Sequence, residues 1–158
     1  MNENKPTDNE VESALDCFGV YSSTTKGPSM RPLFRTHKDI VIITKPNKPI
    51  RRYDVVLYRG NRTGKYILHR VIKVKDGHYV IRGDNTFENE LVGVNEIIGV
   101  LSEFIRGGKH RTVNSVGYRF YSVAWTFIYP LRFVAHKITS FLKAIYRMIF
   151  RRKEDGGR

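Results

Sequence analysis

The sequence predicts a mainly β domain with a short helix before it and a basic helical segment after it. Short runs rich in valine, isoleucine and tyrosine alternate with turn sequences in the middle of the chain, which is typical of a β-sheet or barrel-like domain. Apolar residues recur at helical spacing near both ends. We therefore expect an N-terminal helical segment at 1–19, a β domain at 20–108 and a basic, aromatic helical tail at 109–158.

The first segment carries the pattern of one short amphipathic helix. Thr7 and Glu10 have the spacing of a capping box, in which each side chain bonds the backbone N–H of the other residue. Gly19 is typical of the position just after a helix. The sequence therefore predicts a helix over about residues 8–18. Its apolar side chains are Val11, Ala14, Leu15 and Phe18.

The middle of the chain contains runs with the composition of β-strands. Turn sequences separate these runs, and two of them, GNRTG and KDG, favour hairpins. Strands this short and evenly spaced favour a compact sheet over alternating strands and helices. The predicted strands are 39–44, 53–59, 65–74, 78–83 and 96–106.

Most of the excess positive charge lies in the last third of the chain. Residues 1–100 carry 16 Lys and Arg against 12 Asp and Glu, whereas residues 101–158 carry 12 against 3. Within 131–149, apolar residues recur at helical spacing and cations follow another stripe, which predicts a basic amphipathic helix. Such a helix binds an anionic membrane surface, docks on a partner protein or packs on its own domain, and the sequence leaves these alternatives open. No nucleic-acid-binding motif accompanies the charge, so nucleic acid is not the expected partner.

Several features predict a cytoplasmic protein, attached at most to the inner face of a membrane through its basic tail. The first residues are polar and acidic, without the pattern of a signal peptide or an apolar anchor. The longest uncharged stretch, 120–131, has twelve residues, fewer than the roughly 20 that a membrane-spanning helix needs. The single cysteine, Cys17, permits no internal disulfide.

Ser29 and His69 are the candidate catalytic pair. Ser29 follows a Gly-Pro turn in the run GPSMRP, and His69 lies in the apolar run LHRVI. A serine hydroxyl is a weak nucleophile near neutral pH, and a neutral imidazole within hydrogen-bond reach activates it. Taken alone, each residue also fits a structural role, as a turn serine or as a packed strand histidine. The spacing of the histidines and carboxylates fits no metal site, and we expect no cofactor.

The motifs between residues 20 and 105 resemble, in order and spacing, those of the signal peptidase I superfamily, which also includes the self-cleaving repressors of the SOS response. SMRP at 29–32 is similar to the box that carries the family's nucleophile, and LHRVI is similar to the box of its general base. GDN at 83–85 and the run GVNEIIGV are similar to its later boxes. DIVII and YDVVLY, led by Asp39 and Asp54, look like its paired strands.

The resemblance implies a serine endopeptidase of this β fold that cleaves a leader or precursor peptide, with Ser29 as nucleophile and His69 as general base. Histidine at this position is typical of the endoplasmic-reticulum and archaeal signal peptidases, whereas the bacterial enzymes have lysine. In those relatives a carboxylate after the Gly-Asp-Asn box orients the imidazole. Asp84 and Glu90 are the candidates here, and Asp84 fits better as an anchor of its loop.

The resemblance also implies that the backbone N–H of Ser29 donates to the oxyanion, and that substrate binds extended, with pockets for small residues. A second interpretation is a non-catalytic binding module. It keeps the same β fold as a platform, and its basic C-terminal helix binds a membrane or a nucleic acid. The presence of both Ser29 and His69 favours the peptidase.

Overall fold

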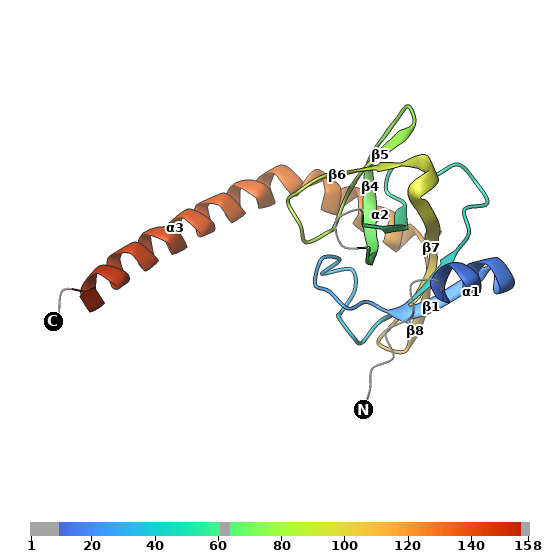
Figure 1. Ribbon diagram of the computed structural model, residues 1–158, viewed down its shortest axis with the longest axis horizontal. Helices are drawn as coiled ribbons and strands as arrows, with labels where there is room; N and C mark the ends of the chain where they lie inside the picture. The colour runs from blue at the N-terminus through green and yellow to red at the C-terminus, as the bar shows by residue number, and fades with distance from the viewer. Residues whose placement is uncertain (1–9, 61–63, 156–158) are drawn as a thin grey trace. The chain divides into compact units, whose positions relative to one another are not determined.

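The computed structural model describes residues 10–60 and 64–155 (Figure 1). It confirms the predicted mainly β architecture, in which a curled antiparallel sheet follows a short helix and precedes further helices along the chain. The strands are β1 (Val20–Thr24), β2 (Ile40–Thr44), β3 (Val55–Arg59), β4 (Tyr66–Lys75), β5 (His78–Arg82), β6 (Glu90–Gly93), β7 (Ile97–Arg106) and β8 (Lys109–Thr112). The helices are α1 (Glu10–Phe18), α2 (Val116–Phe127) and α3 (Tyr129–Asp155), with a short 3₁₀-helix, η1, at Val94–Glu96.

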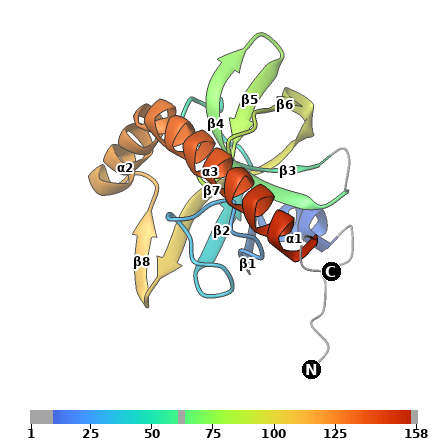
Figure 2. The ribbon, with the colours of Figure 1, turned by 90° about the vertical axis from the view of Figure 1, so that its left-hand side faces the viewer.

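The sheet has the strand order β1-β2-β7-β3-β4-β5-β6, and β8 forms a hairpin with β7 (Figure 2). Because β7 pairs with β2 on one side and β3 on the other, it joins the two halves of the sheet. The predicted strands correspond to β2, β3, β4, β5 and β7, with ends that differ by no more than two residues.

Strands β1, β6 and β8 are not predicted from the sequence, because none of them has the apolar content of the other strands. The sequence of β8 is KHRT, and β1 ends in two serines and a threonine. These strands are held by pairing with a more apolar neighbour: β1 pairs with β2, β6 with β5, and β8 with β7. Tertiary pairing therefore outweighs the weak local preference of these residues.

Two apolar clusters lie on the two faces of the sheet. In β3, Val55 and Leu57 belong to the first cluster, whereas Val56 and Tyr58 belong to the second. This division follows from the alternation of side chains along a strand. The first cluster also contains buried residues of α1 and of the segment after Ser29: Val11, Leu15, Met30, Leu33 and Phe34.

Helix α1 confirms the predicted N-terminal helix. Val11 and Leu15, one turn apart, are buried, whereas Phe18 is exposed and does not join the predicted apolar face. Gly19 ends the helix with a φ of 70°, and its N–H donates to the Leu15 carbonyl oxygen, the conformation in which glycine is preferred. Thr7, and with it the predicted capping box, lies outside the described residues.

The chain divides into two compact units, one up to Val123 and one from Ala124. This division lies beyond the predicted boundary at 108, because β8 pairs with β7 and the Ser122 side chain bonds to Arg70. The second unit contains α3, which includes the predicted helix at 131–149. Among the described helices, none combines the length and the apolar character needed to cross a membrane.

Candidate active site

Ser29 lies in a turn that follows β1 and is anchored by three inward-facing side chains. Met30, Leu33 and Phe34 are buried, and the Phe34 N–H donates to the Met30 carbonyl oxygen at 3.0 Å. Ser29 itself is half-buried. The apolar residues around it therefore fix the backbone of the turn while its own side chain stays accessible.

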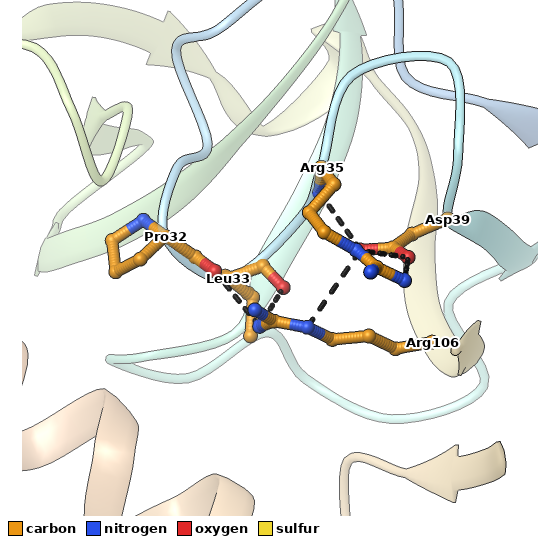
Figure 3. A network of polar contacts seen from close by, with 5 residues as sticks. All are labelled: Pro32, Leu33, Arg35, Asp39 and Arg106. Atoms are coloured by element: carbon orange, nitrogen blue, oxygen red, sulfur yellow. Dashed lines mark hydrogen bonds and ion pairs between the residues drawn. The ribbon is translucent and has the colours of Figure 1, made fainter.

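The segment after the turn is held by an ionic network at the end of β7 (Figure 3). Arg106 donates to the carbonyl oxygens of Pro32 and Leu33, at 2.8 and 2.9 Å. The buried Asp39 carboxylate accepts hydrogen bonds from the backbone and guanidinium of Arg35. Burial alone would raise the pKa of Asp39, but Arg35 and Arg106 outweigh it and hold this pKa below its usual value. The network thus ties the Ser29 turn to the central strand.

His69 lies on β4 and contacts two side chains from neighbouring parts of the sheet. Its Nδ1 is 3.0 Å from Glu90 Oε1 and 3.2 Å from the Tyr58 hydroxyl. The pairing registers of β3 to β6 bring these three side chains together. His69 pairs with Val56, two residues before Tyr58 on the same face of β3. Val71, two residues after His69, pairs with Ile81, which in turn pairs with Glu90.

The Glu90 contact sets the tautomer of His69. A carboxylate only accepts hydrogen bonds, so Nδ1 carries the proton and Nε2 is left as a proton acceptor. Burial lowers the pKa of His69 below its usual value, and the charge of Glu90 opposes this shift only in part. Burial, together with Glu90, also raises the pKa of Tyr58. At neutral pH the site therefore contains a neutral imidazole and a neutral phenol.

Gly83 lies between His69 and Ser29. A Cβ atom built on Gly83 would be 2.9 Å from His69 Nε2 and 2.7 Å from the Ser29 carbonyl oxygen. His69 Nε2 and the Ser29 carbonyl oxygen are therefore close neighbours, since both lie within contact distance of a single methyl position. The Ser29 hydroxyl makes no hydrogen bond to His69 within the described part of the chain. Hydrogen bonds of this kind are often long in ligand-free sites and tighten when substrate binds.

Asn85 connects the Gly-Asp-Asn turn directly to the serine. Its backbone N–H donates to the Ser29 carbonyl oxygen at 2.7 Å, and its side-chain amide donates to the Pro28 carbonyl oxygen at 3.3 Å. Both contacts use carbonyl groups of the turn and leave the Ser29 N–H unused; among the described residues, that N–H donates to no acceptor. It is therefore available to an oxyanion, whereas Pro28 has no N–H to offer.

Asp84 pairs with Arg70. The Arg70 guanidinium donates to both carboxylate oxygens at 2.7 and 2.8 Å, and both side chains are buried. The Tyr121 hydroxyl donates to Asp84, and Arg70 also donates to Ser122 of α2. Of the two carboxylates considered for the His69 ring, Glu90 makes the contact and Asp84 does not.

Sequence reasoning misses three groups at this site. Tyr58 reads as a core aromatic residue, Arg70 as one of many cations, and Asn85 as a turn residue. The signal for Arg70 is its position directly after His69 on a strand that crosses the core. Because successive side chains of a strand point to opposite faces of the sheet, one of these two polar residues has to be buried on each face. Tyr58 has no comparable signal, since only the register places it beside His69.

No model of a known protein family matches the chain, and no curated protein does so either. In the part of the chain that the structure describes, no group of three or more His, Cys, Asp or Glu side chains is arranged to hold a metal ion.

Gly83→Ala is expected to lower any activity of this site about a hundredfold, the effect of a displacement of about 1 Å between reacting groups. The new methyl group would overlap the Ser29 carbonyl oxygen and His69 Nε2, and the backbone atom cannot rotate away. Gly117→Ala is the control, because nothing lies within 4 Å of its Cβ position. A steady-state assay in which Gly83→Ala retains the full rate would show that the spacing across Gly83 is not required.

Proposed function

We propose that this chain is a serine endopeptidase of the signal peptidase I type that acts through Ser29, His69 and Glu90. The observation that carries the proposal is the placement of the two imidazole nitrogens. Nδ1 contacts a carboxylate, and Nε2 lies beside the serine turn across Gly83. Nucleophile, base and orienting group are the three parts that such a mechanism needs.

In the proposed reaction, Ser29 Oγ attacks the scissile carbonyl carbon while His69 Nε2 accepts the hydroxyl proton. Glu90 stabilises the imidazolium that forms, and the imidazolium then gives its proton to the leaving amine. The resulting acyl-enzyme is hydrolysed by water, with His69 again acting as base. The Ser29 N–H donates to the oxyanion, an interaction worth about 3 kcal/mol in the transition state.

The sheet edge at β1 suits an extended peptide substrate. Among the described strands, β1 pairs only with β2, and it leads into the turn that carries Ser29. A peptide that adds to this edge as another strand gains backbone hydrogen bonds and brings its scissile bond toward the serine. The resemblance to signal peptidases adds the expectation of small side chains next to the cleaved bond.

The proposal is tested by incubating the full chain with leader-like peptides that carry alanine at the first and third positions before the cleavage point. Mass spectrometry of the products identifies cleavage, and peptides with bulky residues at those positions serve as controls. The alternative, a non-catalytic binding module, predicts no cleavage of any peptide and retention of binding after Ser29→Ala. Cleavage that continues at an equal rate after Ser29→Ala would contradict the proposal.

The pH dependence of cleavage follows from the lowered pKa of His69. The base is active when neutral, so kcat/KM is expected to fall as the pH drops through this pKa, below the usual histidine range of about 6.5. Glu90→Gln removes the charge that favours the imidazolium. The acid limb of the pH–rate profile is then expected to move to lower pH. The kcat value is also expected to fall, by up to about 10⁴-fold, the loss found where such a carboxylate fixes the tautomer of the catalytic histidine.

Glu88→Gln is the control for Glu90→Gln, since Glu88 is exposed and precedes β6. Its pH–rate profile is expected to match that of the unchanged protein. An acid limb that Glu90→Gln leaves in place, together with an unchanged kcat, would exclude Glu90 as the orienting group. Asp84 would not replace it, because its oxygens are held by Arg70.

A further inference from the structure

Helix α3 carries an exposed apolar stripe along much of its length. Leu131, Phe141 and Met148 expose between 66% and 73% of their surface. At 100° per residue, these side chains fall within one continuous arc of the helix. The remaining exposed members of this arc are Val134, Ile138, Leu142, Ile145 and Tyr146.

Three cations of α3 lie on the other side of the helix from the apolar arc. Arg132, Lys143 and Arg147 differ by eleven and four residues, so they project in nearly the same direction, away from the apolar arc. No acidic residue occurs anywhere between Glu103 and Glu154 in the sequence. From Tyr129 to Lys153 this helix therefore carries positive charges and no negative charge.

An anionic lipid surface satisfies both sides of such a helix at once. Acyl chains take up the apolar stripe, while lipid phosphates face the cations, which extend toward the headgroups. A nucleic acid would use only the cations and leave the stripe in water. A second copy of the chain would cover the stripe but bring more positive charge toward this helix.

We propose that α3 binds in the plane of an anionic membrane surface, with its apolar stripe in the acyl boundary and its cations among the headgroups. This binding does not depend on the peptidase activity proposed above. The single tryptophan offers a probe within the same unit of the fold. Trp125 stacks with Arg132, whose guanidinium carbon is 4.0 Å from the centre of the ring.

The test uses the full chain with vesicles of phosphatidylcholine alone and vesicles that also contain phosphatidylglycerol. Co-sedimentation measures binding, and the emission of Trp125 reports on its surroundings. We expect tight binding with a blue shift on the anionic vesicles only, weakened by salt because exposed charges are screened. Equal binding to both vesicle types, or none to either, would overturn the proposal.

Two sets of substitutions separate the stripe from the cations. Changing Arg132, Lys143 and Arg147 together to glutamine is expected to weaken binding to anionic vesicles about a hundredfold, at about fivefold for each cation near the surface. Changing Leu131, Ile138 and Phe141 together to serine is expected to abolish the blue shift. Circular dichroism and size exclusion establish that each variant is folded and report its oligomeric state.

The matched control replaces three exposed lysines of the first unit, Lys26, Lys48 and Lys75, with glutamine. This variant loses the same charge but keeps α3 intact, so its vesicle binding is expected to fall only slightly. An equal fall in both triple variants would show that net charge rather than α3 drives binding. Dimerisation that disappears with the serine substitutions, without vesicle binding, would assign the stripe to a second copy instead.

Discussion

Replacing Ser29 with alanine is expected to abolish peptide cleavage while the fold stays intact. Loss of the nucleophile costs about 10⁶-fold in kcat in serine peptidases. The turn is held by Met30, Phe34 and the Arg106 contacts, none of which involves the Ser29 hydroxyl. The measurement is the initial rate of peptide hydrolysis by mass spectrometry, together with the urea midpoint of the unfolding transition.

Ser140→Ala is the matched control for Ser29→Ala, because Ser140 is an exposed serine of α3, distant in sequence from both the Ser29 turn and the β1 edge. Its hydrolysis rate and urea midpoint are expected to equal those of the unchanged protein. A shifted urea midpoint in Ser29→Ala would mean that its loss of activity reflects unfolding. Full hydrolysis by Ser29→Ala would remove this serine from the mechanism.

Arg70→Met is expected to lower the free energy of unfolding by about 3–5 kcal/mol, the usual effect of breaking a buried ion pair from one side. The substitution leaves the Asp84 carboxylate buried, with the hydrogen bond from the Tyr121 hydroxyl but without the cation that pairs with both of its oxygens. It also removes the donor to the Tyr53 carbonyl oxygen and the Ser122 hydroxyl. Urea unfolding followed by fluorescence measures the change.

Two further variants make the Arg70 result specific. Lys45→Met breaks the exposed pair between Lys45 and Asp16 and is expected to cost less than about 1 kcal/mol, as surface ion pairs do. Adding Asp84→Leu to Arg70→Met removes the uncompensated charge and is expected to recover part of the lost stability. A loss below about 1 kcal/mol for Arg70→Met alone would contradict the structural role given to this pair.

The strands of the sheet that carry the core could be predicted from sequence because their apolar residues and turns are local signals. The β4–β5 hairpin is an example, since Gly77 adopts a φ of 72° at the predicted KDG turn. Strands β1, β6 and β8 could not be predicted, because their own residues give a weak strand signal and pairing with a more apolar neighbour holds them in the sheet. Helix α2 lies within the predicted helical tail at 109–158, but its bounds could not be predicted, because its one buried residue, Ser122, is polar and contacts Arg70.

The pair of Ser29 and His69 could be proposed from sequence, whereas the roles of the two carboxylates could not be separated there. Glu90 reaches His69 because β6 pairs with β5 in a register that places Glu90 opposite Ile81. Asp84 directly follows Gly83, and its carboxylate pairs with Arg70, whose side chain lies on the opposite face of β4 from that of His69. Both outcomes depend on strand register, which short motifs in a sequence do not specify.

The central claim is that Ser29 and His69 act as one catalytic unit, and the most direct test compares Ser29→Ala, His69→Ala and the double variant. Groups that act in one step give losses that do not add. We expect kcat/KM of the double variant to be no lower than that of Ser29→Ala. Losses that add in the double variant, or a His69→Ala protein that cleaves at the original rate, would contradict the claim.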